Sequence, residues 1–215
     1  MLIRYYDHAC FSVESAGGTL VAFDPYDDHV GYPLPRLHPD VVLVSHGHMD
    51  HANTALFPQA RHIIRSRGVH TPMKDVHVEG FLSYHDDVNG AKRGENIIFK
   101  LTMDDLRIVH LGDLGHALTE EDRAKIGKVD VLFLPIGGFY TIDAIQAREV
   151  IQKLAPQVTI PMHYKTAANP ASPMAQADDF YALLGIKPQP TRILRVTRED
   201  ISCIPELVAM ERADA

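Results

Sequence analysis

Val41-Val42-Leu43-Val44-Ser45-His46-Gly47-His48-Met49-Asp50-His51 joins an uninterrupted aliphatic run to a dense group of polar side chains. The aliphatic run is typical of a strand that is buried on both faces. The loop that leaves this strand carries four side chains able to bind a metal ion: His46, His48, Asp50 and His51. Imidazole and carboxylate ligands suit zinc, manganese or iron better than calcium, which prefers oxygen ligands alone. The stretch therefore predicts a metal site at the end of a buried strand.

A loop that turns away from a sheet edge can supply two neighbouring cations at once. His46 and His48 would face one cation, while Asp50 and His51 would face the second. Four side chains seldom complete two coordination spheres, so we expect further ligands at other strand ends.

Three more residues of ligand type stand where a predicted strand ends: His85 after 81–84, Asp113 after 106–111 and His163 after 158–161. If these strand ends share one rim, His85 joins the first metal and His163 joins the second. Asp113 would then bridge the two metals. His110 competes with His85, because it lies three residues before Asp113 within a predicted strand. Its alternative roles are a core residue or a hydrogen-bond donor to a ligand.

The remaining patterns favour two sheets covered by helices, within a single domain over residues 1–215. The other predicted strands are 2–6, 10–14, 19–23, 41–44, 61–64, 97–101, 129–134 and 193–196. Helices are expected at 119–126, 142–154 and 174–184. Thr119 and Asp122 resemble a capping box at the start of the first helix.

Composition narrows the range of partners. The 215 residues carry 21 Lys and Arg against 28 Asp and Glu, for a net charge of −7, and include 13 histidines. No basic run exceeds two residues, which argues against general nucleic-acid binding. No apolar run approaches the roughly eighteen residues of a membrane span, and no signal peptide is visible. The two cysteines are far apart in the sequence, so we expect the protein to lie in a reducing cytoplasm. The expected partner is a small-molecule substrate, and homo-oligomerisation stays open.

Taken together, these residues resemble those of a known family. Its landmarks stand in the order of the metallo-β-lactamase fold superfamily: Asp24 after a strand, the 46–51 cluster, His85, Asp113 and His163. The resemblance covers roughly residues 2–200 and is strongest to the small single-domain branch that includes ascorbate-6-phosphate lactonase. The segments 112–115 and 160–164 carry that closer similarity.

The resemblance implies an α+β fold, a four-layer αββα sandwich with a site for two divalent metal ions at one sheet edge. Zinc is favoured, and manganese or iron are alternatives. Asp24 is implied to hold the 46–51 loop through hydrogen bonds instead of binding metal. Many β-lactamases use cysteine where this chain has Asp113, and flavodiiron relatives carry glutamate in place of His48, so neither activity is expected.

The expected chemistry is hydrolysis of a small, anionic lactone, ester or phosphodiester. Two ions that share a water lower its pKa from about 15.7 toward about 7, which supplies hydroxide at neutral pH. Asp50 would orient this nucleophile, and His116 is a candidate proton donor to the leaving group. Tyr140 and Lys165 are candidate substrate contacts, because they follow a glycine-rich turn and a ligand, respectively.

Three other readings stay open at the level of sequence. A mononuclear iron oxygenase of the same fold normally needs two histidines and one carboxylate, and this chain offers more ligands. A nuclease would need a basic surface beside the site. A metal-binding scaffold without activity would need no substrate pocket.

Overall fold

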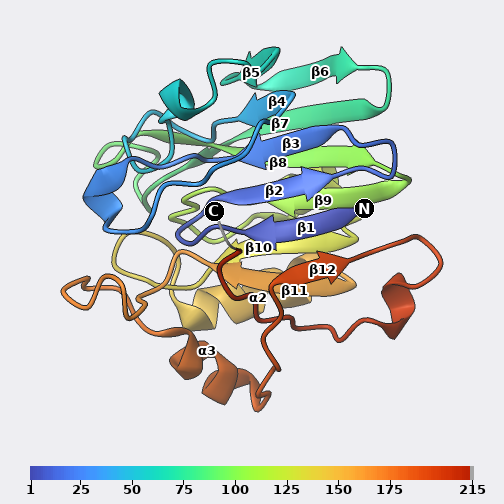
Figure 1. Cartoon of the computed structure of the whole chain (residues 1–215). Coiled ribbons are helices and arrows are strands. Elements are labelled where there is room, and N and C mark those ends of the chain that lie inside the picture. Colours follow the sequence, from blue (N-terminus) through green and yellow to red (C-terminus); the bar gives the residue numbers. More distant parts are fainter. Residues whose placement is uncertain (214–215) are drawn as a thin grey trace.

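Two six-stranded sheets pack face to face in the computed structural model, which describes residues 1–213 (Figure 1). The first sheet has the order β12-β1-β2-β3-β4-β5. Its strands are β1 (Leu2–Tyr5), β2 (Phe11–Glu14), β3 (Leu20–Phe23), β4 (Val41–Leu43), β5 (His62–Ile64) and β12 (Ile193–Arg195). The second sheet has the order β11-β10-β9-β8-β7-β6. Its strands are β6 (Gly68–Met73), β7 (Val76–Tyr84), β8 (Glu95–Met103), β9 (Leu106–His110), β10 (Val131–Pro135) and β11 (Val158–Met162).

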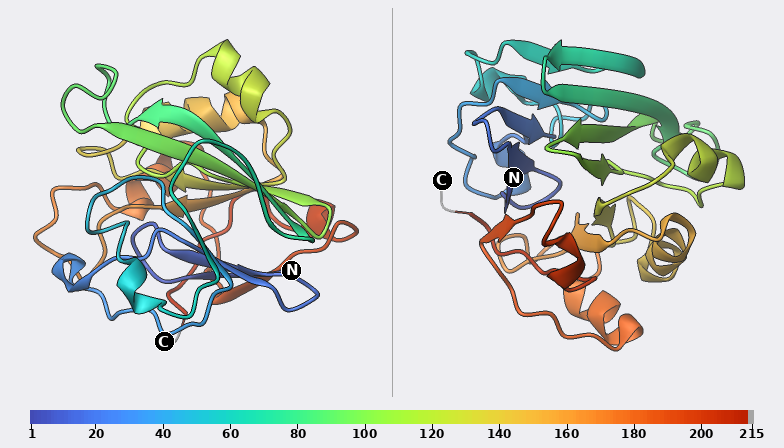
Figure 2. Two further views of the ribbon diagram at one scale, coloured as in Figure 1. Left: turned by 90° about the horizontal axis from the view of Figure 1, so that it is seen from above. Right: turned by 90° about the vertical axis from the view of Figure 1, so that its right-hand side faces the viewer.

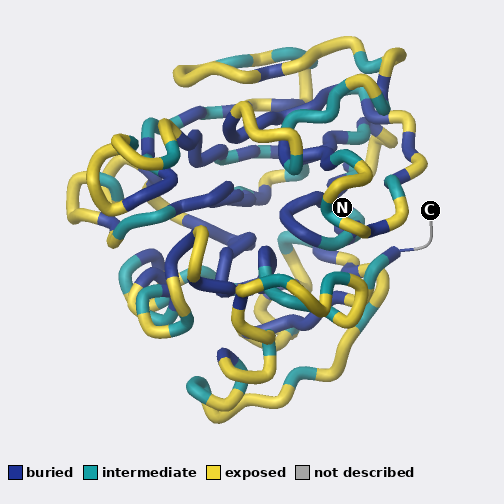
Figure 3. Tube along the Cα trace, turned by 90° about the vertical axis from the view of Figure 1, so that its left-hand side faces the viewer, coloured by how far each residue is buried: buried dark blue, intermediate teal, exposed yellow. Residues whose placement is uncertain are grey.

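The main core lies between the two sheets, where apolar side chains from both inner faces meet. Phe11 of β2 stacks on Phe133 of β10 with 4.0 Å between the ring centroids. Every residue of β4 is buried, as the continuous aliphatic run 41–44 predicted, and every residue of β10 and β11 is buried as well. Figure 3 shows the buried strands inside a shell of exposed loops.

Three helices cover the outer face of the second sheet (Figure 2): α1 (Glu120–Ile126), α2 (Ala144–Leu154) and α3 (Ala177–Leu184). Thr119 closes the predicted capping box with Asp122 at the start of α1. Ala147, Val150 and Leu154 form the buried stripe of α2. Among residues 1–213, no helix is both long and apolar enough to cross a membrane.

The two-sheet sandwich was predicted correctly, but its other outer layer differs from an α-helical one. Loops and two short 3₁₀ helices, η1 (Asp28–Val30) and η2 (Thr54–Leu56), cover the outer face of the first sheet. This segment contains Pro25, Pro33, Pro35, Pro39 and Pro58. Proline lacks the N–H that an α-helix interior needs, so the segment packs as irregular backbone.

The hairpin of β6 with the first half of β7 was not predicted. β6 is an edge strand with no buried residue, so it shows no alternation of apolar and polar side chains. Pro72 lies where the pairing register shifts between His70 and Met73. Proline is tolerated at a bulge of an edge strand and disguises such a strand in the sequence.

Parallel pairing brings the chemically important strand ends to one rim. β3, β4 and β5 are mutually parallel in one sheet, and β9, β10 and β11 are parallel in the other. Carboxyl ends of parallel strands meet at the same edge of a sheet, where ligands of α/β folds commonly bind. The segments that follow β4, β9 and β11 carry all of the predicted metal ligands except His85, which follows β7.

Candidate metal centre

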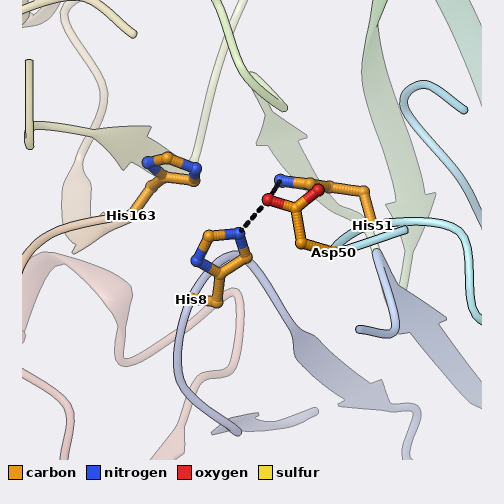
Figure 4. A group of neighbouring side chains, drawn as sticks. All are labelled: His8, Asp50, His51 and His163. Atoms are coloured by element: carbon orange, nitrogen blue, oxygen red, sulfur yellow. Dashed lines mark hydrogen bonds and ion pairs between the residues drawn. The ribbon is translucent and has the colours of Figure 1, made fainter. Parts of the chain in front are cut away.

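Two groups of metal-capable side chains meet at this rim. The first consists of His46, His48 and His85, and the second of His8, Asp50, His51 and His163. Within each group, one ligand atom per residue lies within 4.8 Å of the others. Figure 4 shows the second group, whose side chains converge from three segments far apart in the sequence. The structure thus brings together both sets of histidines that the sequence paired.

Asp113 lies between the two groups. Its Oδ2 is 3.1 Å from Nε2 of His85 and 3.2 Å from Nε2 of His163. Its Oδ1 is 3.2 Å from Nε2 of His51. One carboxylate therefore contacts histidines of both groups, which is the position expected of a bridging ligand.

Asp24 orients the 46–51 loop through hydrogen bonds to Ser45 and His51. Its Oδ1 accepts the backbone N–H of Ser45 at 2.7 Å, and its Oδ2 accepts the Ser45 hydroxyl at 2.6 Å. Oδ2 also accepts Nδ1–H of His51 at 2.8 Å. Because the Ser45 hydroxyl proton is committed to Asp24, the Ser45 oxygen accepts Nδ1–H of His46 at 2.9 Å. Nδ1 of both imidazoles is thereby engaged, which leaves Nε2 of each directed at the centre, as metal ligands require.

The loop after β9 approaches the His85 backbone very closely. A Cβ atom at Gly115 would lie 2.3 Å from the carbonyl carbon of His85 and 2.4 Å from the nitrogen of Asp86. At Gly112, which has φ +55°, a Cβ would lie 2.3 Å from Oδ1 of Asn96. Asn96 in turn accepts the backbone N–H of Asp113 at 3.0 Å. The two glycines thus allow the bridging carboxylate to sit against the His85 strand end.

The donor set fits divalent metal ions. Within residues 1–213, nine buried side-chain nitrogen and oxygen atoms have no hydrogen-bond partner, and most belong to this centre. They include Nε2 of His46, Nε2 of His51, Nδ1 of His8, His85 and His163, and Oδ1 of Asp113. Leaving a buried polar atom without a partner costs about 1–3 kcal/mol. Nε2 of His46 and Nε2 of His51 lie 4.0 and 3.2 Å from oxygens of Asp113. Metal ions there would supply the missing partners of these atoms, since imidazole nitrogens and carboxylate oxygens are ligands of zinc and iron.

Strained backbone also gathers at this rim. Asp7, His8, Asp24 and His163 all have positive φ, at 69°, 57°, 42° and 52°. A non-glycine residue in this region costs on the order of 1 kcal/mol and persists only where its surroundings enforce it. Tyr5 Oη donates to the His8 carbonyl at 3.1 Å, and the His163 N–H donates to the same carbonyl at 2.7 Å.

Burial and charge set the protonation states of the centre. Burial lowers the pKa of His46 to about 3 and that of His8 to about 4, so both are neutral at pH 7. Burial opposes ionisation of Asp50, but the hydrogen bond from His8 and the nearby imidazoles outweigh it, and the pKa of Asp50 is lowered. The pKa of Asp113 is likewise held well below its usual range by His163 and His51, against burial. His51 differs, because Asp113 and Asp24 raise its pKa well above the ordinary value despite burial. Metal binding at His51 would displace that proton, since neutral imidazoles and ionised carboxylates are the forms that bind metal.

The competition between His85 and His110 is resolved by position. His110 is fully buried between the sheets and stacks on Phe23 at 5.0 Å. Its Nε2–H donates to the Ala9 carbonyl at 2.9 Å, and its Nδ1 accepts the Gly112 N–H at 3.0 Å. With both ring nitrogens occupied, His110 supports the core, whereas His85 reaches the centre.

The structure does not bring His116 into the centre. Its Nδ1–H donates to the Ala117 carbonyl at 2.9 Å, and its Nε2 accepts the Tyr84 N–H at 3.2 Å. Neither ring nitrogen is left for a leaving group. The structure therefore does not place His116 where the proton donor expected from the sequence would stand.

A cavity of about 340 Å³ opens over both ligand groups. Its lining consists of His8, His48, Asp50, His85, Arg93, Asp113, Tyr140, His163 and Met174. Tyr140 is therefore placed as predicted, whereas Lys165 lines a separate hollow with Tyr164 and Thr166. His8 and Arg93 were missed by sequence reasoning, because each lies in a turn with no recognisable motif.

Comparison with known proteins supplies the family. The Beta-lactamase superfamily domain matches residues 2–163, three-quarters of the chain and all the ligand-bearing segments. The chain belongs to the beta-lactamase superfamily. Within this superfamily it belongs to the UPF0173 family, since it is 33% identical to a UPF0173 metal-dependent hydrolase of Thermoplasma acidophilum over 190 residues. That match covers 76% of this chain and 83% of the relative.

Solved structures of the beta-lactamase superfamily share the fold. A Thermotoga maritima protein of this superfamily is 33% identical, with a TM-score of 0.79 and 98% of both chains covered. The diiron beta-hydroxylase CmlA from Streptomyces venezuelae is 15% identical, with a TM-score of 0.56 over 75% of this chain and 44% of that one. The second likeness concerns the fold alone, so fold by itself does not select between hydrolysis and oxidation.

Proposed function

We propose that this protein is a hydrolase that uses two divalent metal ions to cleave a small ester, lactone or phosphodiester. In this proposal His46, His48 and His85 hold one ion. Asp50, His51 and His163 hold the other, and Asp113 contacts both. The observation that carries the proposal is the position of Asp113 between the two groups, with oxygens 3.1 to 3.2 Å from His85, His163 and His51.

When bound, two such ions would generate a hydroxide nucleophile at neutral pH and stabilise negative charge on the substrate. The protein's part is to position the groups that hold them. Asp24 fixes the ring of His51, and Nε2 of His8 contacts Oδ2 of Asp50 at 3.2 Å. A held Asp50 carboxylate can both bind metal and accept a hydrogen bond from the attacking water.

Zinc is the metal we favour, with manganese and iron as alternatives, because imidazole-rich sites accept all three. Hydrolysis is supported by the name of the UPF0173 relatives as metal-dependent hydrolases. The ester and phosphodiester classes are proposed because a two-metal site suits the cleavage of both and because the cavity is small. A lactone is proposed from the resemblance to lactonases. A reducing cytoplasm is proposed because Cys10 and Cys203 are both free.

The first experiment is elemental analysis of the protein purified without chelator and without added metal. About two zinc or manganese ions per chain support the proposal, which then calls for a screen of esters, lactones and phosphodiesters. One iron per chain would instead support an oxygenase, and no metal after reconstitution would overturn the metal centre.

Replacement of the bridging residue tests the two-metal arrangement. We expect Asp113→Ala to bind less than one metal per chain and to lose at least 100-fold in hydrolysis, because both ions lose a ligand. Asp179→Asn is the control, since Asp179 is exposed on α3 and belongs to no group of metal-capable side chains among the described residues. Full metal content in Asp113→Ala would contradict the bridging role.

A further inference from the structure

Arg93 is the one permanently cationic side chain in the cavity lining that residues 1–213 provide. The protein as a whole carries a net charge of −7, so this local charge runs against the overall balance. Within the same residues, no carboxylate lies within ion-pair distance of the guanidinium, although nearby Lys92 pairs with Asp87 at 3.0 Å. An arginine at the wall of a cavity without an acidic partner is available to a ligand.

The guanidinium is also held in place. Its Nη2 donates to the Phe139 carbonyl at 3.1 Å, and its central carbon lies 5.7 Å from the centre of the Tyr140 ring. These contacts join the 86–94 loop to the turn after β10. Only one of the five N–H groups of Arg93 donates a hydrogen bond to residues 1–213. Its other donors match the two oxygens of a carboxylate or phosphate.

The loop that carries Arg93 is organised by a single buried carboxylate. Asp86 accepts the backbone N–H groups of Val88, Gly90, Lys92 and Arg93 at 2.8–2.9 Å. Asp86 directly follows His85, so the position of the guanidinium is tied to a proposed metal ligand. This fixed geometry separates a binding residue from an arginine that is merely exposed to solvent.

We propose that Arg93 binds an anionic group of the substrate, and that this group is separate from the bond that is cleaved. The substrate would then be an ester or lactone that also carries a negatively charged group. Carboxylate and phosphate satisfy the same fork of donors, and both remain candidates for this group. The cavity of about 340 Å³ limits the substrate to a small molecule. This inference rests on the proposed hydrolase function.

The kinetic test compares two 4-nitrophenyl esters of similar shape, the anionic glutarate monoester and the neutral 5-methylhexanoate. We expect Arg93→Gln to lower kcat/KM for the anionic ester about 10- to 100-fold, the value of a charge-assisted hydrogen bond, and for the neutral ester less than about twofold. Arg93→Lys should recover part of the loss. Lys92→Gln is the matched control, because it removes the same charge from the same loop outside the cavity lining.

A binding measurement separates failure of this inference from failure of the proposed function. Calorimetric titration of the zinc-loaded protein with glutarate and with 3-phosphonopropionate should show a dissociation constant about tenfold higher in Arg93→Gln. Acetate, which has one carboxylate for the metal, should bind both proteins equally. If glutarate binding depends more strongly on Arg93, the group is a carboxylate. If 3-phosphonopropionate binding depends more strongly on Arg93, the group resembles a phosphate.

The outcomes are distinct. Equal losses for both esters, or glutarate binding that is indifferent to Arg93, would overturn the anion site. If the wild type cleaves neither ester but binds glutarate through Arg93, ester hydrolysis fails and the anion site stands.

Discussion

His8 connects ligand segments that lie far apart in the sequence. Its imidazole contacts the carboxylate of Asp50 at 3.2 Å, and its carbonyl accepts the N–H of His163 at 2.7 Å. It also belongs to the second ligand group by distance. A residue that fixes a ligand from outside its own segment is commonly worth a factor of about 10 to 100 in metal affinity.

Replacement of His8 should therefore weaken one metal site more than the other. We expect His8→Ala to lower the zinc affinity of the site with Asp50, His51 and His163 about 10- to 100-fold, measured by titration of metal-free protein against a chromophoric chelator. The affinity of the other site should change less than threefold. His62→Ala is the control, because His62 is exposed on β5. Equal weakening of both sites would show that His8 supports the fold and not one metal in particular.

At the scale of elements, the junction between β7 and the loop after β9 sets the spacing of His85 and Asp113. A methyl group at Gly115 would collide with the His85 backbone, whereas a methyl group at Gly47 would meet nothing within 4 Å. We expect Gly115→Ala to lower the free energy of unfolding by about 1–3 kcal/mol and to reduce bound metal.

Gly47→Ala, within the 46–51 loop itself, should keep both stability and metal content. Denaturant unfolding and elemental analysis of the two variants check this contrast. Normal metal content in Gly115→Ala would mean that the junction yields without moving the ligands.

The elements also show where prediction from sequence reaches its limit. Buried strands such as β4 and β10 were predictable because burial on both faces leaves continuous aliphatic runs. The candidate ligands after β4 were predictable because imidazole and carboxylate have few other reasons to cluster. His8 and Arg93 were not, since one stands on a strained turn and the other on a loop shaped by Asp86. Their roles depend on contacts between segments distant in the chain.

At the scale of the whole molecule, ion pairs with the buried carboxylate of Asp130 connect the segment after β12 to the second sheet. The carboxylate of Asp130, which precedes β10, accepts Nε of Arg107 and Nη2 of Arg198, each at 2.7 Å. Arg198 follows β12 of the other sheet. Burial raises the pKa of Asp130, but the two guanidinium groups outweigh it and hold the pKa at about 2.

The sign of the resulting pH dependence follows from this lowered pKa. Asp130 stabilises the fold at pH values above its ordinary pKa near 4, and the contribution is lost as pH falls toward about 2. We expect Asp130→Asn to lower the free energy of unfolding by about 1–3 kcal/mol at pH 7, because two partly exposed guanidinium groups lose the charge of a buried carboxylate. The deficit relative to wild type should shrink between pH 4 and pH 2. Urea unfolding across this range measures it.

Asp105→Asn is the control, because the Asp105 side chain is exposed and only its carbonyl accepts Arg198. A deficit for Asp130→Asn that stays constant down to pH 2 would contradict the assigned role of the ionised carboxylate.

The loop organised by Asp86 has a consequence for how this lineage can diverge. Four backbone amides, and not the side chains that follow, hold the loop to its carboxylate. Exchanges at positions 87–93 can therefore accumulate while His85 stays where it is, except at Gly90, whose φ of +81° and contact with Gly94 favour glycine. A homologue in which another residue replaces Arg93 would then keep the metal ligands and differ in substrate specificity. Relatives that share every ligand of this centre need not share a substrate.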